Sequence, residues 1–108
     1  MTEIDKYKLT MSRAYTKEEV RDQFLNHVRG LIDYWSARPD STKECVEGVA
    51  FSILAALDGG SGLPAFYVVA SPHPSDRDFN KSLGENYYPS ASLMNDIAGD
   101  LHERLFKQ

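Results

Sequence analysis

Hydrophobic side chains recur every three or four positions over residues 20–35, and this is the clearest pattern in the chain. The spacing puts them on one face of a helix, so it predicts a helix over residues 16–38. Thr16 and Glu19 fit a capping box, in which each side chain accepts a hydrogen bond from the other residue's backbone amide. Pro39 predicts the end of the helix, because proline disfavours helical geometry in the residue before it.

A second, shorter helix is predicted over residues 42–47, with Asp40 or Ser41 as its N-cap and Gly48 at its end. The apolar run that follows, residues 49–57, is long enough for a buried strand. Its alanine and leucine residues also suit a helix that continues through residue 57. The pattern within this run therefore leaves two interpretations open.

The residues after this run favour the strand interpretation. Residues 58–62 read Asp-Gly-Gly-Ser-Gly, which is a strong turn signal, and residues 65–70 are rich in aromatic and β-branched side chains. Two apolar runs around a glycine-rich turn predict an antiparallel β-hairpin. Apolar and polar residues also alternate in the N-terminal arm, residues 1–15, which leaves two interpretations, a short edge strand and a loosely docked arm.

The segment of residues 71–90 is longer than most connections in a compact domain. It contains Phe79, Leu83 and Tyr88, and apolar residues of this size need somewhere to pack. We therefore expect an ordered loop that these three side chains anchor, with Glu85 or Asn86 hydrogen-bonded to the body of the domain.

Apolar residues four apart from Leu93 to Leu105 predict a last helix, capped by Ser90 or Ser92. Together these elements predict an α+β fold, with two to three helices packed on a small antiparallel β-hairpin or three-stranded sheet and a long ordered loop. With 108 residues, of which 42% are hydrophobic, the chain has the size and composition of one domain. That domain is expected to span residues 16–108, behind the N-terminal arm.

Composition excludes several classes of function. The net charge is -4 and no window clusters lysine and arginine, so we expect no nucleic-acid binding. The longest apolar run is far too short to span a membrane, and the N-terminus has no apolar region typical of a signal peptide. Cys45 is the single cysteine, and a free thiol is typical of a reducing compartment, so we expect a cytoplasmic protein.

Side chains able to bind a ligand or a metal gather in two places, the loop of residues 71–90 and the last helix. The candidates are His73, Asp76, Asp78, Glu85, Asn86, His102 and Glu103. If the loop folds back over the helix, its imidazole and carboxylate groups would meet His102 and could bind a metal or transfer protons. The structural alternative is that the two aspartates cap turns, as such residues usually do.

Several short motifs together resemble a pattern found in small bacterial proteins of unknown function. The motifs are Gly48-Val49-Ala50-Phe51-Ser52-Ile53-Leu54, Leu57-Asp58-Gly59-Gly60, Pro72-His73-Pro74, Gly84-Glu85-Asn86-Tyr87-Tyr88-Pro89, Asp96-Ile97-Ala98-Gly99 and Leu101-His102-Glu103. The resemblance covers roughly residues 16–106. It implies a bacterial, single-domain protein, and it implies no activity, cofactor or partner.

No catalytic motif is recognisable in the sequence, since it contains neither a serine-hydrolase elbow nor a phosphate-binding loop. The first hypothesis is therefore a non-enzymatic protein-interaction module without a cofactor. A small sheet has open edges, which favours a homodimer or another protein partner. The alternative hypothesis is a small-ligand or metal-binding protein, or an enzyme, that uses the loop of residues 71–90 and the last helix.

Overall fold

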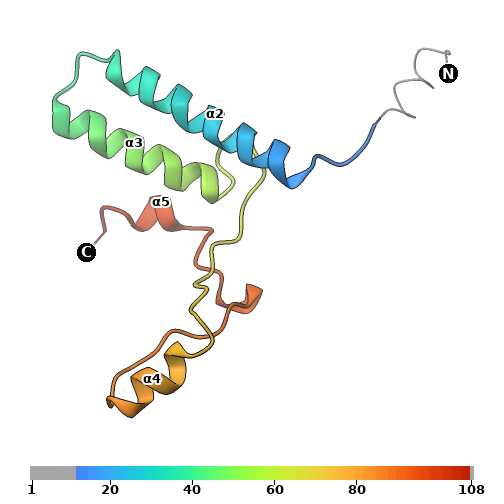
Figure 1. Ribbon diagram of the computed structural model, residues 1–108. Helices are drawn as coiled ribbons and strands as arrows, with labels where there is room; N and C mark the ends of the chain where they lie inside the picture. Colours follow the sequence, from blue (N-terminus) through green and yellow to red (C-terminus); the bar gives the residue numbers. More distant parts are fainter. Residues whose placement is uncertain (1–11, 108) are drawn as a thin grey trace.

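The computed structural model describes residues 12–107, and within that range it contains helices and no strand (Figure 1). The helices are α2 (Lys17–Ser36), α3 (Thr42–Leu57), α4 (Asp76–Ser82), the 3₁₀ helix η1 (Leu93–Asn95) and α5 (Leu101–Arg104). The prediction of an α+β fold with a β-hairpin or three-stranded sheet is therefore wrong for the described residues, which are all-helical. The strand-like alternation in the N-terminal arm falls on residues 1–11, outside the described residues.

Helix α2 begins as the sequence predicts. The Thr16 hydroxyl accepts from the Glu19 amide at 3.2 Å, and the Glu19 carboxylate accepts from the Thr16 amide at 2.9 Å, so the capping box is confirmed. Arg13 also donates to both oxygens of Glu19, at 2.7 and 3.1 Å. These hydrogen bonds lower the pKa of Glu19 to about 2, and the hydrogen bond from Arg13 contributes most to the shift. The helix ends at Ser36, before the proline.

Helix α3 replaces both the short second helix and the first predicted strand. Ser41 caps it by accepting from the Glu44 amide at 3.2 Å, and the helix then continues through Gly48 to Leu57. Gly48 does not break the helix. It is instead the position where the Trp35 side chain of α2 packs against α3. A Cβ atom at Gly48 would lie 2.6 Å from three atoms of the Trp35 ring. The glycine therefore marks a close approach of two helices.

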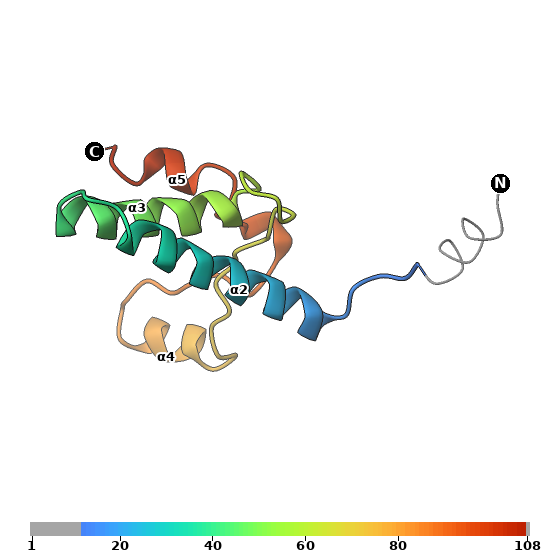
Figure 2. The ribbon, with the colours of Figure 1, turned by 90° about the horizontal axis from the view of Figure 1, so that it is seen from above.

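The body of the protein is an antiparallel pair, α2 and α3, with α5 against α3 (Figures 1 and 2). The Trp35 indole donates to the Ser52 hydroxyl at 3.2 Å, which ties the two long helices together. At the other end of α2, Phe24 packs edge-on against Phe66 with ring centroids 5.4 Å apart. Ala56 is the single fully buried residue among residues 12–107. The core is therefore thin.

The turn after α3 is the end of a helix rather than a hairpin. Gly59 has φ +90°, a region that favours glycine, and a Cβ atom there would lie 2.9 Å from the Ala65 Cβ. The following segment is extended, but it runs beside residues 96–98. The Ile97 amide donates to the Val68 carbonyl at 2.8 Å, and the Val68 amide donates to the Asp96 carboxylate at 2.7 Å.

The predicted last helix is interrupted. Residues 93–95 and 101–104 are helical, and the residues between them are not. The Asp96 carboxylate accepts from the amides of Val68 and Ala98, which holds the chain out of a helix at this point. Gly99 then adopts φ +124°. The four-residue spacing of the apolar residues Leu93, Ile97, Leu101 and Leu105 therefore does not trace one helical face.

Candidate functional site

The segment of residues 71–90, here called the α4 arm, contains α4 and projects away from α2, α3 and α5 (Figure 1). The predicted anchors do not pack on the body, since Phe79, Leu83 and Tyr88 are 63%, 56% and 74% exposed. The Glu85 amide donates to the Asn80 carbonyl at 2.9 Å, which is a bond within the arm and not one to the body. The arm is thus an excursion from the body that leaves its apolar side chains uncovered.

The structure places the seven candidate residues in two separate groups. His73, Asp76, Asp78, Glu85 and Asn86 lie in the α4 arm, whereas His102 and Glu103 lie in α5 beside α3 (Figure 1). The histidine and carboxylates of the arm therefore do not meet those of α5.

Within the arm, the polar side chains shape the turn that leads into α4. The Asp76 carboxylate accepts from the His73 amide at 3.2 Å. The His73 ring nitrogen Nδ1 lies 2.7 Å from the Ser75 hydroxyl and accepts from the Ser75 amide at 3.2 Å. Asp76 therefore has the local turn-capping role that the sequence offered for the two aspartates as the alternative to ligand binding.

In the body, His102 pairs with a residue that the sequence did not single out, Asp58 at the end of α3. The Asp58 side chain is 1% exposed, and one of its oxygens lies 2.5 Å from His102 Nδ1. The same carboxylate accepts from the backbone amides of Gly99 at 2.6 Å and of His102 at 2.9 Å. The His102 ring also packs edge-on against Phe51, with centroids 5.4 Å apart. Asp58 thus fastens α5 to the end of α3.

Two opposing effects act on the ionisation of Asp58. Burial raises the pKa of its carboxyl, but the hydrogen bonds from the His102 ring and from the amides of His102 and Gly99 outweigh burial. The pKa of Asp58 therefore lies below its ordinary value. On the helical interpretation of residues 49–57, one sequence signal points to this residue, since a carboxylate at the C-terminal end of a helix opposes the helix dipole and gains from a positively charged partner.

The chemistry available to this pair is limited by its surroundings. A proton on His102 Nδ1, donated to Asp58, would leave Nε2 as an acceptor, which is how a carboxylate orients a catalytic histidine. Glu103 has an oxygen 3.9 Å from Nε2. In the described part of the chain, no serine, threonine or cysteine side chain is hydrogen-bonded to that nitrogen. The observed contacts of the pair are those of a structural fastening.

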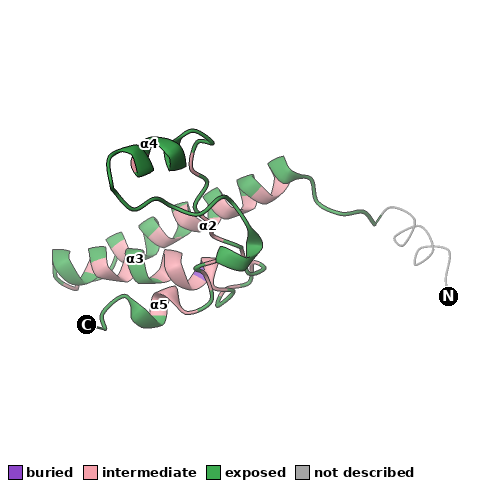
Figure 3. Ribbon diagram, turned by 90° about the horizontal axis from the view of Figure 1, so that it is seen from below, coloured by how far each residue is buried: buried purple, intermediate pink, exposed green. Residues whose placement is uncertain are grey.

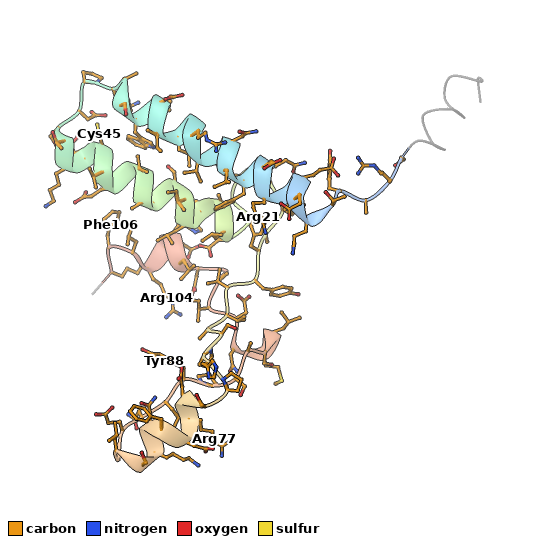
Figure 4. All side chains as sticks on the ribbon, viewed as in Figure 1. Arg21, Cys45, Arg77, Tyr88, Arg104 and Phe106 are labelled. Carbon is orange, nitrogen blue, oxygen red and sulfur yellow. The ribbon has the colours of Figure 1, made fainter. Side chains whose placement is uncertain are left out.

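An uncovered apolar groove of the body, here called the α2–α3 groove, lies along α2 and α3. It has a volume of about 400 Å³ and is lined by Trp35, Ser36, Cys45, Val46, Val49, Ala50 and Ile53. None of these side chains carries a charge. Figure 4 shows Cys45, one of the lining residues, near the beginning of α3, with Phe106 below α3.

Comparisons with protein-family models, with curated proteins and with solved structures find no match for this chain. Within residues 12–107, no three histidine, cysteine, aspartate or glutamate side chains are placed so that they could hold a metal ion. Over the same residues, no helix combines the length and the apolar character that crossing a membrane requires.

Proposed function

We propose that this chain is a non-enzymatic interaction module that completes its hydrophobic core by pairing with a second copy of itself. The observation that carries the proposal is the apolar surface left uncovered in one copy. Ala56 alone is buried among residues 12–107, while 16 large hydrophobic side chains are exposed. In Figure 3 the half-buried residues gather where α2, α3 and α5 face one another, and the α4 arm is almost entirely exposed.

The exposed area is larger than a compact monomer needs. The chain exposes 8807 Å², whereas a compact protein of 12.2 kDa exposes roughly 6,100 Å². The twelve residues outside the described range, about 1.5 kDa, could contribute at most about 2,100 Å². A compact protein of the remaining mass exposes roughly 5,500 Å², so the described residues keep an excess of about 1,200 Å². A standard protein interface covers about 800 Å² on each partner. The excess is therefore large enough for a specific interface.

A second copy is the partner that the chain itself favours. Closed two-fold dimers are the commonest assemblies of identical chains, and they bury the same patch on both copies. The net charge of -4 is small, so repulsion between two copies is weak. The module would thus form a complete core only in the dimer.

Thermal unfolding over a range of protein concentrations tests this proposal. A dimer that is more stable than its separate copies melts at a higher temperature when the concentration is raised. We expect the melting temperature to rise over about a hundred-fold increase in concentration. A melting temperature that is independent of concentration would contradict self-association.

A matched pair of variants tests whether the dimer interface includes the α2–α3 groove. Val46 is 63% exposed in the groove, so Val46→Glu should leave one copy folded and weaken the dimer at least about ten-fold. Asn26→Glu makes the same charge change at an exposed position of α2 that does not line the groove. The control should keep the concentration dependence of the native chain. Equal behaviour of the two variants would place the interface elsewhere.

A further inference from the structure

We infer that the two copies are joined by arm exchange, with the α4 arm of each copy seated in the α2–α3 groove of the other. This inference rests on the self-association proposed above and names the two surfaces that meet. It starts from an unusual combination in one chain. The body has an uncovered apolar groove, and the arm has uncovered apolar side chains.

The arm holds its shape without help from the other helices. Tyr87 lies in the segment that follows α4. The Arg77 guanidinium and the Lys81 ammonium lie over its ring, 5.6 and 5.5 Å from the ring centroid. The Glu85 amide bonds back to the Asn80 carbonyl at 2.9 Å, next to Gly84 with φ +70°. Figure 4 shows Arg77 and Tyr88 within this arm, well below α2 and α3. A segment ordered in this way can be presented to a partner at little entropic cost.

The apolar side chains of the arm are placed for docking. Phe79 lies in α4 and Leu83 caps its end four positions later, so they project from the same side of the helix. Both are more than half exposed. Ordered apolar side chains without a covering surface are typical of binding anchors, and the i, i+4 spacing is that of a helix that lies in a groove.

The groove matches the arm in length and chemistry. Helix α4 has seven residues, which corresponds to a length of about 10 Å. Along α3, the groove extends from Cys45 to Ile53, which is about 12 Å and long enough for the helix of the arm. Its lining is uncharged, so the phenyl and isobutyl groups of the arm would lose water without burying an unpaired charge.

Reciprocal exchange closes the assembly. If the arm of one copy fills the groove of the other, two-fold symmetry requires the second arm to fill the first groove. The arm and the groove of each copy are then covered in a dimer, and no free arm or groove is left to bind a third copy. Two equal contacts also predict a specific result when damaged copies are mixed.

The test uses an arm variant, Phe79→Glu, a groove variant, Val46→Glu, and a control outside both surfaces, Asn26→Glu, each in the full chain. Native mass spectrometry separates the species by mass. Alone, the arm and groove variants should each dimerise at least about ten-fold more weakly than the native chain, because both contacts of their homodimers are damaged. The control should dimerise like the native chain, since Asn26 lies outside both the α4 arm and the α2–α3 groove.

Mixing the arm variant with the groove variant is the decisive step. Their heterodimer retains one intact contact, between the native arm of one copy and the native groove of the other, so it should predominate over both homodimers. A native dimer that Phe79→Glu does not weaken would overturn arm exchange while the proposed function stands. A native chain that stays monomeric would overturn both. Two weakened variants that gain nothing on mixing would also overturn arm exchange.

Discussion

Replacing Asp58 with asparagine is expected to lower the free energy of unfolding by about 2–3 kcal/mol at neutral pH, one of the largest effects available in this chain. The carboxylate is 1% exposed and serves three donors, the His102 ring and the amides of His102 and Gly99. An asparagine can keep one acceptor oxygen, but its amide nitrogen would face a donor of the same kind. The contact that holds α5 on α3 would then be weakened, in a domain whose total stability is of the order of 5–15 kcal/mol.

Urea unfolding measures this loss, and Asp100→Asn is a matched control. The Asp100 carboxylate is 46% exposed and pairs with Arg104 on the surface, at 2.6 Å. Exposed pairs of this kind contribute less than about 1 kcal/mol, so the control should be nearly as stable as the native chain. If Asp58→Asn is no less stable than Asp100→Asn, the Asp58–His102 contact does not hold α5 in place.

The loss should also depend on pH in one direction. The folded state lowers the pKa of Asp58, so the unfolded state binds its proton more tightly. The stabilisation by Asp58 is therefore complete above the ordinary carboxyl pKa of about 4 and is lost as the pH falls through the lower folded value. The difference in stability between the native chain and Asp58→Asn should be full at neutral pH and shrink below about pH 4. A difference that persists unchanged at about pH 2 would contradict this assignment.

Gly48→Ala and Gly30→Ala are expected to change stability in opposite directions, although both replace a glycine within a helix. Alanine is favoured over glycine in a helix by about 1 kcal/mol. At Gly30 a Cβ atom would have nothing within 4 Å, so this variant should gain that amount. At Gly48 the Cβ atom would lie 2.6 Å from the Trp35 ring, and overpacking of this kind costs about 1–3 kcal/mol or more.

The Trp35 ring has little freedom to move aside. Its indole nitrogen is bonded to Ser52 at 3.2 Å, and the Arg38 guanidinium lies 5.3 Å from its ring centroid. Thermal melts of the two variants should therefore fall on opposite sides of the native chain. Trp35→Leu combined with Gly48→Ala should recover part of the loss, relative to the sum of the two single changes, because the smaller side chain makes room for the methyl group. A stabilised Gly48→Ala would show that α2 and α3 do not approach each other closely at this point.

The sequence predicts α2 well because two local signals agree there. Its apolar residues keep a helical period, and its capping box involves residues only three apart, Thr16 and Glu19. Helix α3 is different, since residues 49–57 are apolar on all sides and carry no period that separates a helix from a strand. Gly48 was misleading for a physical reason. Its lack of a side chain is required by Trp35, 13 positions earlier, and a contact of that kind leaves no local pattern.

The candidate site residues likewise divide into those with local contacts, which the sequence could predict, and those with long-range contacts, which it could not. Asp76 could be assigned a turn-capping role from the sequence, because its hydrogen bond, from the His73 amide, is local. The partner of His102 lies 44 positions away in Asp58, and only the path of the chain from α3 to α5 brings the two together. The exposure of Phe79 and Leu83 was unforeseen for a related reason. Apolar residues in a loop predict packing, but they do not tell whether the surface that covers them belongs to the same copy.

Sedimentation equilibrium on the full chain, over about a hundred-fold range of concentration, tests self-association most directly. We expect the weight-average mass to approach twice 12.2 kDa at high concentration and to fall toward 12.2 kDa on dilution, with no larger species. A mass that stays at 12.2 kDa at every concentration would contradict the proposal that a second copy completes the core.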